Sequence, residues 1–159
     1  MLAANRLSDA FIRHHPDKSA DLLENYPTED VASLLSNQED KAVVAVLEHS
    51  LPLTGASYLS AWPIATSVRY LEQLHTDCAL NLLRHTPDKS REELLTAMHG
   101  DKADTYRRML RYPTECAGAH MDPFVTVLSE SITVADAMKR VRKLKKESFY
   151  FPYVVNTEQ

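Results

Sequence analysis

The sequence predicts a mainly α-helical protein, in which a right-handed superhelix of short helices, similar to a small α-solenoid, precedes an incomplete α/β segment. Helix-start signals recur about every twelve residues up to residue 111. The chain holds only three glycines, which argues against a β-rich fold full of tight turns. After residue 122 the pattern changes to strand, helix and strand. We therefore expect a helical module over residues 1–111, a junction over 112–122 and a second, truncated module over 123–159.

The helix starts of the first module are marked by proline, by side chains that can cap a helix and by acidic residues. Such groups satisfy free backbone N–H groups or favour the positive end of the helix dipole. The starts are expected at Pro16-Asp17, Pro27 to Asp30, Asn37 to Asp40, Thr76-Asp77, Pro87-Asp88 and Gly100-Asp101. Between them, apolar residues three and four apart put one stripe on each helix. Helices this short need tertiary packing for stability, which favours a compact stack.

Three further features of the first module bear on its packing. Pro16-Asp17-Lys18-Ser19 reappears as Pro87-Asp88-Lys89-Ser90, an echo that suggests an internal repeat. The single tryptophan, Trp62, precedes a proline and is expected to be a core anchor at a joint between helices. Gly55 marks either a close contact between helices or a turn.

The junction and the second module follow a different pattern. Pro113 ends a helix near Tyr112. A β-rich run over 124–128 and a turn at 129–131 lead to a helix over 133–146, with Thr133 as its N-cap and an apolar face. A second strand is expected over 150–155. Two strands and one helix leave an open sheet edge, so we expect this segment to pack on the helical module or to pair with a second copy in a homodimer.

Composition and charge narrow the classes of function. At 44% hydrophobic and 25% charged residues, the chain is typical of globular proteins. It has no apolar stretch of ~20 residues that could cross a bilayer, and Cys78 and Cys116 are expected to be free thiols in the cytoplasm. Residues 1–122 hold 12 Lys/Arg and 18 Asp/Glu, a net charge of −6. An acidic helical module fits cation binding or an intramolecular interface better than nucleic acid.

No arrangement of nucleophile, base and orienting residue is visible, and the sequence lacks a Gly-rich phosphate loop. We therefore expect that the chain is not an enzyme.

One segment resembles a known family. Tyr112-Pro113, Ala117-Gly118 and Met121 are similar to the Tyr-Pro-x-x-x-Ala-Gly-x-x-Met segment that joins the helical N domain of MgtE-type magnesium transporters to their first CBS domain. The stretches Met-Asp-Pro-Phe-Val-Thr-Val, Ile-Thr-Val-Ala-Asp-Ala-Met and Phe-Pro-Tyr-Val-Val that follow it are similar to the first half of a CBS domain. The resemblance implies an MgtE N domain followed by a truncated CBS domain.

The resemblance also implies a function and a cofactor. In the family, the N domain and the CBS pair form a cytosolic regulator of a dimeric membrane channel, and Mg²⁺ bound among acidic residues holds these domains together and keeps the pore closed. The implied partner is the remainder of the same transporter, including its membrane domain. Such a cation can bridge acidic surfaces through oxygen ligands and retained waters.

Two residues are candidate Mg²⁺ ligands. Asp77 occupies the place where the family often has a pair of aspartates after a leucine, although an aspartate at a helix start can also be only a cap. Glu115 lies in the junction and is either a solvated carboxylate or an interface ligand. An alternative function is a signalling or scaffold protein of the CBS type, in which the helical module binds a protein partner.

Overall fold

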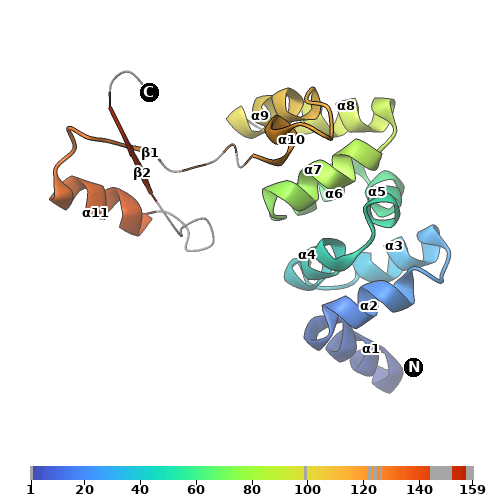
Figure 1. Ribbon diagram of the computed structural model, residues 1–159. Coiled ribbons are helices and arrows are strands. Elements are labelled where there is room, and N and C mark those ends of the chain that lie inside the picture. Colours follow the sequence, from blue (N-terminus) through green and yellow to red (C-terminus); the bar gives the residue numbers. More distant parts are fainter. Residues whose placement is uncertain are drawn as a thin grey trace. The chain divides into compact units, whose positions relative to one another are not determined.

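The computed structural model describes residues 2–98, 100–121, 123, 125, 127–143 and 152–156. Eleven helices and two strands lie in this part of the chain, which divides into two compact units, Met1–His120 and Met121–Gln159. The helices of the first unit follow one another in a continuous stack (Figure 1). They are α1 (Leu2–His14), α2 (Pro16–Leu23), α3 (Thr28–Ser36), α4 (Asp40–His49), α5 (Pro52–Ala61), α6 (Ile64–Leu71), α7 (Thr76–His85), α8 (Asp88–Ala97), α9 (Asp101–Leu110) and α10 (Ala117–His120).

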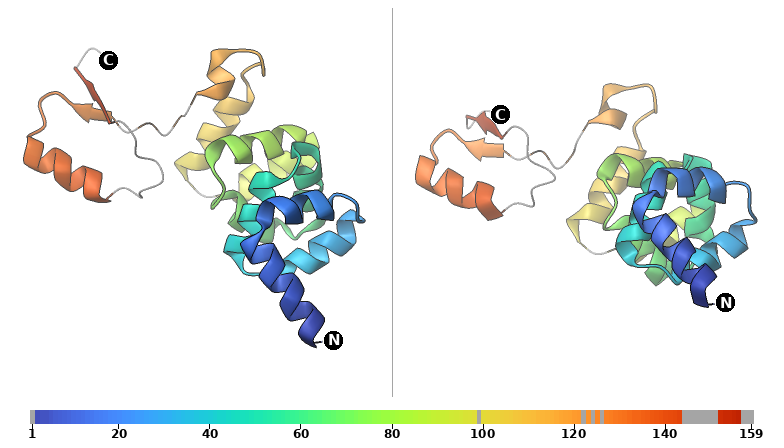
Figure 2. Two further views of the ribbon diagram at one scale, coloured as in Figure 1. Left: turned by 60° about the horizontal axis from the view of Figure 1, so that its bottom comes forward. Right: turned by 90° about the horizontal axis from the view of Figure 1, so that it is seen from below.

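The stack is periodic, and each repeat is made of two helices. The even-numbered helices α2, α4, α6 and α8 begin at equal intervals along the chain, at Pro16, Asp40, Ile64 and Asp88. Each of these helices packs on the next even-numbered one, and α3, α5, α7 and α9 form a second series in the same way. Seen from below, the helices of this unit overlie one another (Figure 2). The echo predicted to mark a repeat falls one position short of three such intervals, because Pro16 begins α2 whereas Pro87 precedes α8.

The core repeats with the same period. Leucines occupy two sets of equivalent positions, and every one of them is buried: Leu23, Leu47, Leu71 and Leu95 in the even-numbered series, and Leu35, Leu59 and Leu83 in the odd-numbered series. Burial of apolar side chains at this spacing lets each helix pair pack on the pair before it. The predicted fold class, a mainly helical chain of short stacked helices with a small α/β segment, is confirmed.

Trp62 is the core anchor that the sequence predicts. Its side chain is 6% exposed, its indole N–H donates to the carbonyl of Ala32 at 2.8 Å, and its ring meets that of Tyr70 edge-on at 5.0 Å. Gly55 is a close helix contact, not a turn. A Cβ added there would lie 2.6 Å from Cδ2 of Leu82, so glycine lets α5 approach α7.

The predicted helix starts are confirmed, and each has the acidic first turn that is one of the two predicted signals, whereas local side-chain caps are absent. None of the helices α2 to α9 has a side-chain cap hydrogen bond. Two starts are served by distant carboxylates instead. Glu24 accepts the N–H of Leu51, which precedes α5, at 3.2 Å. Glu48, one period later, accepts the N–H of His75, which precedes α7, at 3.3 Å.

The second unit is built from a strand, a helix and a strand. These elements are β1 (Val127–Ser129), α11 (Val134–Lys143) and β2 (Tyr153–Val155). The strands pair in parallel with Leu128 opposite Val154, and Thr133 accepts the N–H of Asp136 as the predicted N-cap of α11. Residues 125 and 152 are predicted to be strand but lie outside β1 and β2, and residues 124, 126, 144–146, 150 and 151 of the predicted strands and helix lie outside the described residues.

The sequence predicts that the apolar face of α11 is buried, but in the structure this face is exposed. Val134 is 81% exposed and Met138 is 46% exposed. Among the described residues, no helix is both long enough and apolar enough to span a membrane.

Candidate functional site

Asp77 lies at the positive end of α7. It is the second residue of the helix and is exposed, and His75 holds the N-cap position. The side chain of Asp77 makes no capping hydrogen bond. Its carboxylate is therefore favoured by the helix dipole and is left available to a ligand.

A hollow of about 360 Å³ lies beside Asp77. One wall is a face of α7, and the other belongs to the junction that follows α9. The lining residues are Asp77, Leu80, Asn81 and Arg84 from α7, and Thr114, Ala119 and His120 from the junction. The hollow thus offers carboxylate, amide and hydroxyl oxygens together with an imidazole and the guanidinium of Arg84, which is already engaged by two backbone carbonyls.

The junction is held against α7 by Arg84. Its guanidinium donates to the carbonyls of Met109 and Tyr112, each at 3.2 Å, and so secures the end of α9. Within the junction, Nε2 of His120 lies 2.8 Å from the carbonyl oxygen of Thr114. These contacts fix the wall that Thr114 and His120 contribute to the hollow.

The distinctive residues of the junction sequence have a packing role. A Cβ on Gly118 would lie 2.9 Å from Cδ1 of Tyr112 and within 3.1 Å of two further ring carbons. Gly118 therefore lets the Tyr112 ring lie directly on the backbone of α10. Pro113 ends the preceding helical run and turns the chain back toward this contact.

The second candidate ligand, Glu115, is not brought into the hollow. It is exposed in the turn before α10 and is absent from the residues that line the site. Within the described residues, no three His, Cys, Asp or Glu side chains gather as a metal site would require. The lining of the hollow therefore presents one carboxylate, the guanidinium of Arg84 and several neutral groups, not a complete cage.

Asn81, Thr114 and His120 are site residues that sequence reasoning missed. Asn81 follows Asp77 by one helical turn, a spacing that places both on one face of α7. Thr114 and His120 lie in the junction segment that the sequence singles out, but their approach to α7 depends on tertiary structure.

Negative charge surrounds the start of α7. The pKa of the Cys78 thiol is raised to about 11, first by burial and then by the charges of Glu48 and Asp77. The Sγ atom of Cys78 lies 3.7 Å from the carbonyl oxygen of Leu47, to which it donates. Cys78 is therefore a protonated, packed thiol, and the nearby carboxylates create a potential that attracts cations.

Two solved structures share the fold. The cytosolic domain of the Mg²⁺ channel MgtE in complex with ATP matches with a TM-score of 0.80 and 23% sequence identity, over 96% of this chain and 64% of that chain. The soluble part of a magnesium transporter matches with a TM-score of 0.57 and 19% identity, over 97% of this chain and 67% of that chain. The present chain thus spans about two thirds of the length of each.

Sequence comparison identifies the family. No curated protein matches the chain. The family model for the MgtE intracellular N domain matches residues 14–115, which is more than half of the chain and includes α2 to α9. The chain therefore belongs to the MgtE intracellular N domain family.

Proposed function

We propose that this chain is the cytosolic regulatory portion of a magnesium transporter, and that it gates the pore through Mg²⁺-dependent packing of its domains. One observation carries the proposal. Asp77 faces a hollow whose second wall is the junction, the segment through which the chain continues beyond α10. A cation bound there would touch both the superhelix and the end of the junction.

The chemistry of the hollow suits a hydrated Mg²⁺ ion. Mg²⁺ keeps several of its waters and is often held by one or two carboxylates. Six waters at about 30 Å³ each occupy roughly 180 Å³, which fits within a hollow of about 360 Å³. Asp77 would supply the negative charge, while the side-chain oxygens of Asn81 and Thr114 would accept hydrogen bonds from the bound waters.

The remaining ligands would come from outside this hollow. We propose that Glu115 faces a neighbouring domain and adds a second carboxylate at that interface. The rest of the transporter, with its membrane domain, is the implied partner, and a homodimer would supply a second copy of the site. The chain would then act at the cytosolic face of the membrane and catalyse no reaction.

Mg²⁺ titration with thermal unfolding tests the proposal. For a dissociation constant on the order of 1 mM, about 10 mM Mg²⁺ stabilises the folded state by about 1.4 kcal/mol. This corresponds to a rise of roughly 3–6 °C in melting temperature for a domain of this size. Asp77→Asn should abolish the rise and Glu115→Gln should reduce it. Asp88→Asn is the matched control, because Asp88 holds a first-turn position in α8 and pairs with Arg91.

An equal rise in melting temperature for Asp77→Asn and for the wild type would contradict the assignment of Asp77. No rise at all in the protein extended through a complete CBS pair would contradict Mg²⁺ sensing. The competing function, a CBS-type signalling or scaffold protein, requires a soluble full-length protein that fractionates away from membranes.

A further inference from the structure

The imidazole ring of His120 is oriented by a hydrogen bond at the wall of the hollow beside Asp77. Its Nε2 atom lies 2.8 Å from the carbonyl oxygen of Thr114. Because a carbonyl oxygen can only accept a hydrogen bond, Nε2 carries a proton in this contact. In the neutral imidazole, the lone pair is then on Nδ1, which makes no hydrogen bond with another described residue.

This arrangement is typical of histidines that bind metal ions. A metal-binding imidazole almost always donates its second ring N–H to a carbonyl or a carboxylate, which fixes the ring and its tautomer. His49 and His85 also place one ring nitrogen against a backbone carbonyl, at 2.7 Å and 2.8 Å. Neither of them lines the hollow, whereas His120 lines it together with the carboxylate of Asp77.

The side chains of the hollow distinguish between classes of cation. They include the carboxylate of Asp77, the amide oxygen of Asn81 and the imidazole of His120. Mg²⁺ prefers oxygen ligands, whereas imidazole nitrogen suits transition metals such as Ni²⁺ and Zn²⁺. The guanidinium of Arg84 offsets the charge of Asp77 within this lining, which weakens purely electrostatic attraction of a cation. A nitrogen ligand adds a coordinate bond that does not depend on this net charge.

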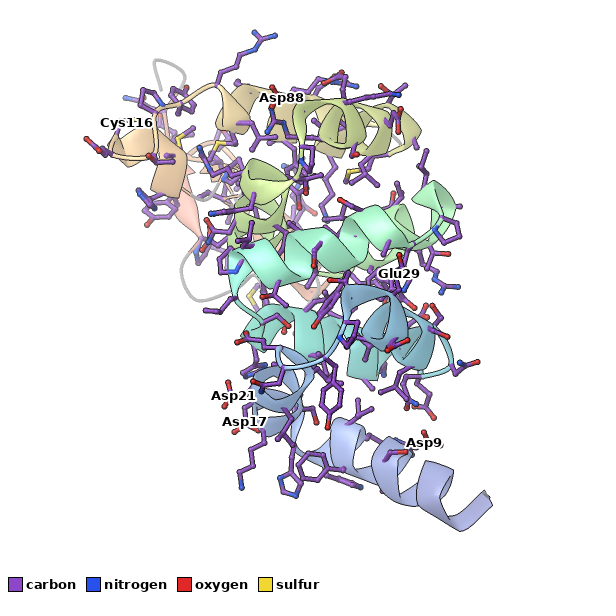
Figure 3. The ribbon with its side chains drawn as sticks, turned by 90° about the vertical axis from the view of Figure 1, so that its right-hand side faces the viewer. Asp9, Asp17, Asp21, Glu29, Asp88 and Cys116 are labelled. Carbon is purple, nitrogen blue, oxygen red and sulfur yellow. The ribbon has the colours of Figure 1, made fainter. Side chains whose placement is uncertain are left out.

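The two cysteines do not add to this set of ligands. Cys116 lies in the junction, toward the end of the stack opposite α1 (Figure 3), but it does not line the hollow. Cys78 is a protonated thiol that donates to the carbonyl of Leu47, and the ligand form of cysteine is the thiolate. Two protein ligands with several waters suit an exchangeable ion better than a permanent structural one.

We propose that Nδ1 of His120 and the carboxylate of Asp77 bind a divalent transition-metal ion of the class that imidazole favours, such as Ni²⁺ or Zn²⁺. Water molecules fill the remaining coordination positions. The proposal rests on the proposed function in one respect, the assignment of Asp77 as a cation ligand, and it adds a second class of cation to the same hollow. Because Asp77 lies in α7 and His120 ends α10, the bound ion ties the junction to α7.

Calorimetric titration of the chain with Ni²⁺ tests the proposal. We expect Ni²⁺ to bind at least about 10-fold more tightly than Mg²⁺. His120→Gln keeps an N–H group for the carbonyl of Thr114 but removes the imidazole, so it should weaken Ni²⁺ binding by about 10-fold or more. The same variant should retain the Mg²⁺-dependent rise in melting temperature, whereas Asp77→Asn should weaken the binding of both ions. The matched control is His49→Gln, because His49 is exposed and its Nδ1 meets the carbonyl of Ala45 outside the hollow.

A second measurement uses the unaltered protein. In nitrogen NMR of the imidazole rings, Zn²⁺ should shift the Nδ1 resonance of His120 while Nε2 remains protonated. Amide exchange at Ala119 shows whether the junction stays closed in His120→Gln, and the NMR titration decides the question if it does not. An unshifted Nδ1 resonance, undiminished Ni²⁺ binding by His120→Gln with a closed junction, or an equal loss in His49→Gln overturns the proposal.

The outcomes separate this proposal from the proposed function. Ni²⁺ binding that requires His120, without any response to Mg²⁺, would support the transition-metal site and contradict Mg²⁺ sensing. A response to Mg²⁺ that requires Asp77, with Ni²⁺ binding that does not require His120, would support Mg²⁺ sensing and overturn the transition-metal site.

Discussion

Replacing Gly118 by alanine tests whether the Tyr112 ring holds the junction on the superhelix. The new methyl group would lie 2.9–3.1 Å from three carbons of the ring, closer than an ordinary contact of about 3.5–4.0 Å. Overpacking of this kind costs about 1–3 kcal/mol. Alanine in place of helical glycine returns up to about 1 kcal/mol. We expect a net loss of about 1–2 kcal/mol, which increases opening of the junction by roughly 5–30-fold.

Amide hydrogen exchange measures this opening directly. The N–H of Ala119 donates to the carbonyl of Cys116 at 3.0 Å, and its exchange rate should rise by the predicted factor. The exchange of core amides in α5 should stay unchanged, because the effect is local. In a Tyr112→Ala background the clash is absent, so Gly118→Ala should no longer accelerate exchange. Equal acceleration in both backgrounds would refute the role given to the ring.

Three further predictions concern the core and the junction. Trp62→Phe removes the indole N–H donated to Ala32 and leaves a void, so urea unfolding followed by circular dichroism should show a loss of about 2–3 kcal/mol. Arg84→Gln withdraws a charged donor from the carbonyls of Met109 and Tyr112, so amide exchange in the junction should increase by about 10-fold, whereas unchanged exchange would contradict the proposed anchor. Burial raises the pKa of Tyr106 to about 12, so the stability it contributes is complete below the ordinary tyrosine pKa of about 10 and is lost as the pH rises toward 12. Tyrosinate absorbance and unfolding should change together in that range, and ionisation of every tyrosine near pH 10 in the folded protein would contradict this assignment.

Local signals predicted where many helices begin, because proline and acidic first turns act within a few residues. The predicted starts did not include those of α5 and α6, whose first turns have no acidic residue, although a joint between helices was expected at Trp62. The acidic first turns that the local signals predicted are present, but no local side chain caps these helices. Glu24 and Glu48 accept the N–H groups of residues 27 positions later, a pairing that exists only once successive repeats have stacked.

Burial likewise depends on the place of a residue in the stack. Leu22 and Tyr70 hold equivalent positions and have similar apolar character, yet they are 54% and 0% exposed. The difference arises because α6 packs on α4, whereas α2 has no preceding even-numbered helix among the described residues. The spacing of apolar residues along the sequence predicts that both residues lie in the core. The packing of neighbouring helices decides which of the two is buried.

The sequence proposes Asp77 as a ligand but does not distinguish it from other acidic residues at helix starts. Glu29, Asp77 and Asp101 hold the same position in the repeats that begin with α3, α7 and α9, and each lies in the first turn of its helix. An acidic residue at this repeat position therefore favours the helix dipole wherever it occurs and does not by itself indicate a ligand. Asp77 differs in its surroundings. Arg84 and the Tyr112–Gly118 contact fold the junction back onto α7 and place Thr114 and His120 across the hollow from Asp77. The candidate site is thus a product of the junction, and loosening the junction should weaken cation binding even when Asp77 is intact.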